Sequence, residues 1–249
     1  MRIAVLQTGR APREARARRG DYGRMFVEFF HAPGQWDVLD VEHGEFPARV
    51  NDYDAYIVTG SKYSAYDDVP FIHRLLELIR ELDRARVRTL GICFGHQALA
   101  QALGGWVQPN PLGWALGVRD LHFTPAAAAF PALDAVPRPL RILQTHMDMV
   151  TVLPPGAVHL AHSADTPVEM FALGGHLLGL QGHPELDAEV IRETLRKLGN
   201  VLTPSQVQAA QSSLALAPHD AFLHDWLLDF LTHGMAQRQP QPRPRTAVT

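Results

Sequence analysis

The chain has 249 residues, of which 46% are hydrophobic and 20% charged, and its formal net charge is -3. This composition excludes a disordered chain, and the mild charge gives no reason to expect a nucleic-acid or membrane partner. No run approaches the ~18 apolar residues that a membrane helix needs. The single cysteine, Cys93, permits neither an intrachain disulfide nor a zinc site built on several thiolates. We therefore expect a protein of a reducing compartment, the cytoplasm.

The first half of the chain alternates short apolar runs with a helical pattern. Four runs are typical of buried parallel strands, at residues 2–6, 36–41, 55–58 and 87–92. Apolar residues at helical spacing predict a helix over residues 71–82, with an acid at Asp67 or Asp68 as its cap and Pro70 in its first turn. Strands that alternate with helices predict an α/β fold with a doubly wound, mostly parallel sheet flanked by helices.

Residues 118–180 have a different pattern, with shorter β-like runs. These runs lie at residues 118–123, 141–144, 159–162, 168–173 and 176–180. Gly174-Gly175, between the last two runs, is a strong signal for a hairpin turn. We expect this segment to add antiparallel strands at one edge of the sheet.

The C-terminal part is predicted to be helical. Asp187 can cap one helix, and Thr203 begins a capping box for the next. A last helix carries an apolar stripe from Phe222 to Leu231, which we expect to pack on the main domain, a subunit contact being the alternative. The sequence thus predicts a main domain at residues 1–200, a helical extension at 201–235 and a Pro- and Gln-rich disordered tail at 236–249.

The strongest chemical signal is Gly91-Ile92-Cys93-Phe94-Gly95, at a predicted strand-to-helix turn. Glycines on both sides of a central residue permit the tight turn that presents a nucleophile at a strand tip. The start of a helix also favours the thiolate form of a cysteine. For this motif alone, a buried and inert cysteine is the alternative.

A second motif, Gln181-Gly182-His183-Pro184-Glu185, follows the predicted strand at residues 176–180. A histidine at a strand end can reach a neighbouring strand end, where Cys93 is expected. Pro184 favours an extended conformation at His183, and Glu185 can accept the second imidazole N–H and fix the tautomer. The pattern predicts a nucleophile, a base and an orienting carboxylate.

A glycine turn, Thr59-Gly60-Ser61, follows the strand at residues 55–58. The backbone N–H groups of Gly60 and Ser61, together with that of Phe94, could form an oxyanion hole. An ordinary strand-to-helix turn is the alternative.

From residue 1 to about 198, these motifs together resemble the class I glutamine amidotransferases. The resemblance implies a flavodoxin-like fold. It implies that Cys93 attacks the side-chain amide of glutamine to form a γ-glutamyl thioester. His183 is implied to transfer the proton, and Glu185 to orient the His183 ring. It also implies that Gln97 lies in the substrate pocket. His146, in a segment similar to the family's S-H-x-D motif, is implied to lie near the amino-acid end of the substrate. No cofactor is implied.

Within this family, residues 44–47 and 63–68 are similar to a stand-alone subgroup. It includes relatives of the amidotransferase domain of GMP synthase and the plant γ-glutamyl peptidases, which cleave glutathione conjugates. Thr59-Gly60-Ser61 replaces the Gly-Gly-Pro-like turn of the synthetase-coupled members, which indicates altered substrate choice. We expect cysteine-dependent hydrolysis of a γ-glutamyl amide. Either ammonia passes from glutamine to a separate synthetase subunit, or the chain acts alone as a peptidase on glutathione-like substrates. The oligomeric state stays open.

Other functions receive less support. A non-catalytic regulatory protein on the same fold is one alternative, and a second cysteine-hydrolase superfamily, whose acidic partner comes early in the chain, is another. His159, His162 and His176 invite a metal hypothesis, but without H-E-x-x-H or a thiolate cluster we expect no metal, and without a P-loop no ATP site. Six arginines between Arg10 and Arg24 could meet an anionic substrate or partner, although a solvated face is the preferred interpretation.

Overall fold

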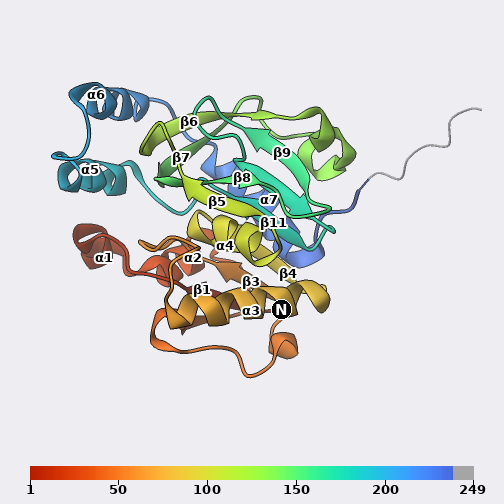
Figure 1. Cartoon of the computed structure of the whole chain (residues 1–249). Helices are drawn as coiled ribbons and strands as arrows, with labels where there is room; N and C mark the ends of the chain where they lie inside the picture. Colours follow the sequence, from red (N-terminus) through yellow and green to blue (C-terminus); the bar gives the residue numbers. More distant parts are fainter. Residues whose placement is uncertain (238–249) are drawn as a thin grey trace, which may run out of the picture.

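A computed structural model describes residues 1–237, which fold around a nine-stranded sheet with the order β2-β1-β3-β4-β11-β10-β9-β6-β7 (Figure 1). A separate pair, β5 and β8, forms a second sheet. The strands are β1 (Arg2–Gln7), β2 (Gln35–Asp40), β3 (Ala55–Val58), β4 (Arg88–Ile92), β5 (Trp106–Pro109), β6 (Ala115–Phe123), β7 (Leu140–His146), β8 (Asp148–Val152), β9 (Val158–His162), β10 (Met170–Leu173) and β11 (Leu177–Leu180).

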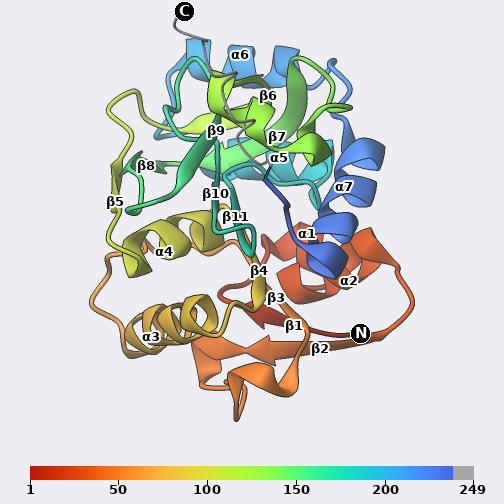
Figure 2. The same ribbon diagram turned by 90° about the vertical axis from the view of Figure 1, so that its right-hand side faces the viewer.

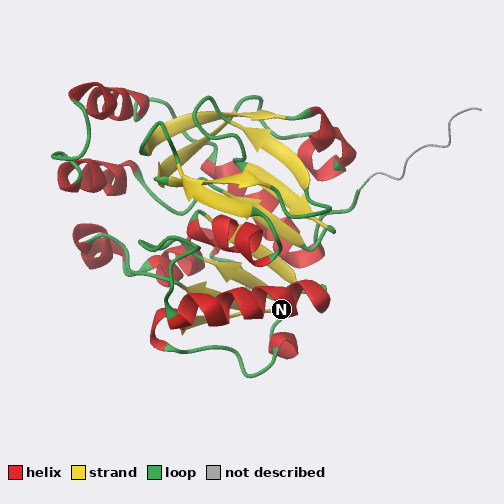
Figure 3. Ribbon diagram, in the orientation of Figure 1, coloured by secondary structure: helices red, strands yellow, loops and turns green. Residues whose placement is uncertain are grey.

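The sheet combines a parallel half with an antiparallel half (Figure 3). Strands β2, β1, β3, β4 and β11 run parallel, whereas β10, β9, β6 and β7 pair antiparallel. This arrangement confirms the predicted α/β fold and its added antiparallel strands. β11 is the strand where the direction changes, since it is parallel to β4 and antiparallel to β10. Gly174 and Gly175 make the β10–β11 turn with φ of 59° and 75°, a backbone region that glycine enters without steric cost.

Helices cover both faces of the parallel half. Figure 2 shows α3 and α4 on one side of β1–β4, and α2 and α7 on the other. The alternation of side chains along β1 explains these two layers: Val5 packs with the buried side chains of α2 and α7, and Leu6 with those of α3 and α4. The helices are α1 (Arg13–Arg19), α2 (Tyr22–Phe30), α3 (Pro70–Arg84), α4 (Phe94–Ala102), α5 (Ala188–Lys197), α6 (Pro204–Ser213) and α7 (Asp220–His233).

The helix ends follow the predicted capping in two cases of three. Asp187 accepts a hydrogen bond from the Val190 N–H at 3.0 Å, and Thr203 forms a capping box with Gln206. The expected acidic cap of α3 is wrong: its N-cap is Val69, without a side-chain cap, because the Asp67 carboxylate accepts from the Ser64 N–H within the preceding turn.

Helices α1 and α2 and strands β5 and β8 were not anticipated from the sequence. Helix α1 lies within the arginine run, where an apolar face is nearly absent, and Ala15 is its buried residue. Strand β5 ends on Pro109 and exposes Trp106, so it lacks the alternation of a half-buried strand.

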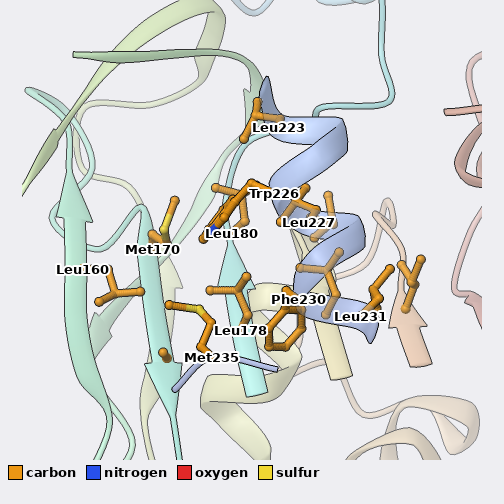
Figure 4. Close-up of a cluster of buried hydrophobic side chains, with 14 of the residues drawn as sticks. Leu160, Met170, Leu178, Leu180, Leu223, Trp226, Leu227, Phe230, Leu231 and Met235 are labelled. Carbon is orange, nitrogen blue, oxygen red and sulfur yellow. The ribbon is translucent and has the colours of Figure 1, made fainter. Parts of the chain in front are cut away.

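Helix α7 packs on the same core as the central strands, as expected for its apolar stripe. Figure 4 shows Leu223, Trp226 and Phe230 directed at a cluster that includes Leu178 and Leu180 of β11. The division into a main domain and a helical extension stays a prediction. The predicted tail lies, from residue 238 on, outside the described residues. No helix within residues 1–237 combines the length and apolar character needed to cross a membrane.

Replacing Phe230 by Ala should lower the free energy of unfolding by about 3–5 kcal/mol, because it leaves a cavity between α7 and the sheet. Phe230 is only 1% exposed, whereas Leu216 is 41% exposed. Leu216→Ala is therefore the control and should change stability by no more than about 0.5 kcal/mol. Urea unfolding monitored by circular dichroism measures both. Equal stability of the two variants would contradict the packing described for α7.

Candidate active site

Cys93 stands between β4 and α4, where the backbone turns from strand into helix. Its φ of 53° lies in the left-handed region, which a residue with a side chain rarely adopts. A Cβ on Gly95 would overlap the carbonyl oxygen of Val58, and one on Gly91 would come within 2.5 Å of the carbonyl oxygen of Gly95. Both glycines are therefore required by the close approach of α4 to β3 and β4. The turn has the geometry of a nucleophile elbow.

His183 lies beside Cys93 because their strands are neighbours. In the parallel pairing of β4 and β11, Ile92 is opposite Leu180, and the Cys93 N–H donates to the Leu180 carbonyl at 2.9 Å. The His183 N–H donates to the Leu143 carbonyl of β7 at 2.8 Å, which anchors the segment after β11. The two side chains consequently line one cavity.

Glu185 fixes the orientation of the His183 ring. Nδ1 of His183 lies 2.7 Å from Oε1 of Glu185, and the two side chains are 2% and 0% exposed. Within residues 1–237, Nε2 of His183 has no hydrogen-bond partner other than the side chain of Cys93, so it is available for proton transfer at that thiol. The structure thus brings together the three residues that the sequence predicts as nucleophile, base and orienting carboxylate.

The charges at this site oppose the effect of burial on His183. Burial alone would lower the pKa of His183, because a buried ring disfavours its charged form. The carboxylate of Glu185 and the side chain of Cys93 outweigh burial and raise the pKa of His183 to about 10. An imidazolium is therefore favoured at neutral pH, provided that Cys93 is a thiolate. Such a pair combines a nucleophile with a proton donor for the leaving group.

The predicted oxyanion turn borders the same cavity. A Cβ on Gly60 would lie 3.0 Å from Cε1 of His183 and 3.9 Å from Cβ of Cys93. The Ser61 hydroxyl donates to the Thr8 carbonyl at 2.6 Å, which fixes the turn after β3. In residues 1–237, the backbone N–H groups of Gly60, Ser61 and Phe94 have no hydrogen-bond acceptor, as an oxyanion hole requires.

A second cavity, of about 200 Å³, lies on the α4 side of Cys93 and is lined by Gln97 and His146. The Gln97 amide donates to the Asp148 carbonyl at 2.8 Å, and Nδ1 of His146 lies 3.0 Å from the same oxygen. Burial lowers the pKa of His146 to about 4, so its ring is neutral at physiological pH. With Nδ1–H donating to the carbonyl, Nε2 is an acceptor; it is buried and lacks a partner in the described chain.

Two aromatic residues at the site were missed from the sequence. Tyr22, at the start of α2, lines the cavity that holds Cys93 and His183, and Trp114 lines both cavities. Burial, followed by the charges of Cys93 and Glu185, raises the pKa of the Tyr22 phenol, which keeps it neutral. Neither residue carries a local motif, because chain segments distant in sequence place them there.

Most of the arginine run is exposed, as the preferred interpretation expects, and part of it also borders the cavity. Arg10, Arg13 and Arg16 line the cavity of Cys93, whereas Arg24 pairs with Glu28 within α2. Arg19 donates to the backbone carbonyl of Glu185 at 2.9 Å and so supports the segment that carries the carboxylate.

The histidines considered for a metal have other contacts. Nε2 of His176 lies 2.9 Å from Asp83, and Nε2 of His159 lies 3.0 Å from the Ala161 carbonyl. Within residues 1–237, the group whose ligand atoms lie close enough to hold an ion is Asp40, Glu42 and His43. Asp40 already forms an ion pair with Arg10 at 2.6 Å, so this cluster is explained without a metal.

Comparisons with known proteins agree with the motifs. A family model described as glutamine amidotransferase class-I matches residues 35–198. The chain is 37% identical over 187 residues to gamma-glutamyl peptidase 5 of Arabidopsis thaliana, covering 73% of this chain and 74% of that protein. It is 30% identical over 161 residues to the glutamine-hydrolyzing GMP synthase of Porphyromonas gingivalis, covering 64% of this chain and 30% of that protein. A glutamine amidotransferase structure from Thermotoga maritima has a similar fold, with a TM-score of 0.73, 23% identity, and coverage of 94% of this chain and 99% of that chain.

Replacing Glu185 by Gln should lower the pKa of His183 by about 1 to 3 pH units, because it removes the nearest negative charge but keeps the shape. The pKa of His183 in the parent protein is about 10, so in the variant the ring should lose its proton as the pH rises through about 7 to 9. Nitrogen chemical shifts of 15N-labelled histidine, followed from pH 5 to 10, measure this change. Glu189→Gln, a change at a half-buried position on α5, is the control. A His183 titration unaltered by Glu185→Gln would show that the carboxylate does not hold the imidazolium.

Proposed function

The chain belongs to the class I glutamine amidotransferase family, and from this premise we propose that it hydrolyses a γ-glutamyl amide through Cys93, His183 and Glu185. One observation carries the proposal. Cys93, with a strained backbone at the start of a helix, shares a cavity with His183, and Nδ1 of His183 is hydrogen-bonded to the buried carboxylate of Glu185. A purely structural role would not explain the strained backbone at Cys93.

In the first half of the proposed reaction, the thiolate Sγ of Cys93 attacks the amide carbon of the γ-glutamyl group. The resulting oxyanion is stabilised by the N–H groups of Gly60, Ser61 and Phe94, for which the described part of the chain offers no acceptor. The C–N bond then breaks, and Nε2–H of His183 gives its proton to the leaving nitrogen. The products of this half are a γ-glutamyl thioester on Cys93 and a free amine or ammonia.

In the second half, water attacks the thioester carbon while the neutral His183 ring accepts a proton from it. The C–S bond breaks, glutamate leaves, and the thiolate of Cys93 returns beside an imidazolium. Glu185 accepts the Nδ1–H of His183 throughout, so its role is to orient the ring and to stabilise its positive charge. The high pKa of His183 favours the pair that begins each cycle.

The γ-glutamyl end of the substrate is proposed to occupy the cavity of Gln97 and His146. The buried, unpartnered Nε2 of the neutral His146 can accept a hydrogen bond from an α-ammonium group. Gln97 is held by two acceptors, the Asp148 carbonyl and, at 3.2 Å, the Gln181 side chain, and this fixes the cavity wall.

Glutamine is the smallest γ-glutamyl amide that this site could take. In that case the released ammonia would pass to a separate synthetase subunit, as the similarity to a GMP synthase suggests. We place the protein in the cytoplasm, because its only thiol is proposed to be the nucleophile and must stay reduced.

Cys93→Ala should abolish hydrolysis of L-glutamine, glutathione and a γ-glutamyl anilide, because no other thiol exists in the chain. Glutamate and amine release by purified protein measures turnover, and denaturing mass spectrometry of the parent protein should detect the γ-glutamyl thioester. Thermal unfolding of the variant serves as the control for folding. Turnover by Cys93→Ala at the parental rate would contradict the role of Cys93 as the nucleophile.

His146→Phe should raise KM for every γ-glutamyl substrate by about tenfold, because one hydrogen bond of roughly 1.5 kcal/mol to a charged group is lost. The rate of Cys93 alkylation by iodoacetamide, a reagent without a γ-glutamyl group, should change little. His122→Phe, at an exposed position near the end of β6, is the control. A parental KM in His146→Phe would remove this residue from the substrate site.

A further inference from the structure

The cavity that Cys93 shares with His183 has a volume of about 320 Å³ and a strongly basic lining. Among residues 1–237, five lining residues besides His183 are cationic, and no aspartate or glutamate lines the cavity; the five are Arg10, Arg13, Arg16, Lys62 and Lys197. A glutamine amide nitrogen leaves as ammonia, which needs neither this volume nor this charge. The cavity is therefore larger and more basic than glutamine hydrolysis alone requires.

Three of the five cations already have carboxylate partners. Arg10 pairs with Asp21 and Asp40, Lys62 lies 3.6 Å from Glu42, and Lys197 lies 3.1 Å from Glu193. Their charges are largely balanced within the protein, so they add little to the attraction of an anion.

Arg13 and Arg16 differ from the other three. Within residues 1–237 neither guanidinium has an ion pair or a side-chain hydrogen bond, although both line the cavity. They follow each other at i and i+3 on α1, so they share one face of the helix. A planar guanidinium with free donors is suited to binding a carboxylate.

The wall that carries these arginines is fixed to the rest of the protein. Helices α1 and α5 lie next to each other (Figure 1), and the Glu193 carboxylate accepts hydrogen bonds from the N–H groups of Glu14 and Ala15 at 3.0 and 2.9 Å. Val190 and Leu198 of the α5 segment add apolar side chains to the lining of the cavity. The cavity could hold a leaving group that has both an apolar body and a negative charge.

We propose that this cavity is the leaving-group subsite and that Arg13 and Arg16 bind the free carboxylate of a γ-glutamyl peptide. The inference rests on the proposed function, because it requires that Cys93 attack a γ-glutamyl bond. Cys93 lines both cavities, so a substrate whose γ-glutamyl end occupies the cavity of Gln97 and His146 can place its leaving amine in the other one. The substrate class is therefore a γ-glutamyl dipeptide or tripeptide with an anionic C-terminus.

The test compares two substrates that differ only in the proposed contact. γ-Glutamylglycine carries the carboxylate, and γ-glutamylglycinamide replaces it with a neutral amide. The parent protein should prefer γ-glutamylglycine by about tenfold or more in kcat/KM, since charge-assisted hydrogen bonds are among the stronger ones. The preference should shrink as NaCl rises from 20 to 500 mM, because salt screens exposed charges.

The double variant Arg13→Gln/Arg16→Gln should lose about tenfold or more in kcat/KM on γ-glutamylglycine, while γ-glutamylglycinamide stays within about twofold of the parent. Arg18→Gln is the matched control, since Arg18 lies on the same helix, pairs with Asp187 and does not line the cavity. It should keep the parental preference. The comparison of substrates on the parent protein does not depend on whether any variant folds.

Two results would overturn the inference alone: equal turnover of both substrates by the parent protein, or an equal loss on both in the double variant. Turnover of neither substrate, together with a Cys93 that fails to react with a γ-glutamyl chloroketone, would instead overturn the proposed function itself. The two failures are thus distinguishable.

Discussion

The structure depends on one steric constraint, the contact of α4 with the ends of β3 and β4. Gly95 lies against the carbonyl of Val58 so closely that no side chain fits between them. This contact forces Cys93 into a left-handed backbone conformation, and the packed core on both sides of the sheet must supply the energy that maintains it. The position of the thiol is therefore set by the packing of α4 on the sheet and not by the intrinsic backbone preference of cysteine.

The carboxyl ends of the parallel strands also determine which charges lie near Cys93. β11 is the last parallel strand, and the segment after it brings His183 and Glu185 to the tip of β4. Burial alone lowers the pKa of a histidine and favours its neutral form. This is the case for His146, whose ring contacts no carboxylate within residues 1–237. At His183 the carboxylate of Glu185, two residues further along the chain, contributes to raising the pKa instead. The pKa values of two buried histidines around one cysteine are thus shifted in opposite directions, and each direction suits the proposed role of its residue.

Much of this arrangement could be predicted from the sequence, because the decisive signals are local. The strands before Cys93 and His183, the glycines around Cys93 and the His-Pro-Glu spacing are all short patterns. What the sequence did not reveal depends on tertiary packing. Tyr22 and Trp114 reach the site only through the fold, and α1 has too little apolar character to show helical periodicity. The unpaired state of Arg13 and Arg16 also required the positions of the acidic residues that neutralise their neighbours.

The solitary cysteine has a further consequence, which concerns oxidation. A thiolate that is oxidised to a sulfenic acid is usually rescued by a second thiol, and this chain contains none. Recovery of Cys93 would require a thiol from solution, and Cys93 is only 6% exposed, so that thiol must enter through one of the two cavities. The larger of the two cavities is lined by the guanidinium groups of Arg13 and Arg16, which have no carboxylate partner in residues 1–237. The protein is therefore built to be reduced more readily by a negatively charged thiol than by a neutral one of equal size.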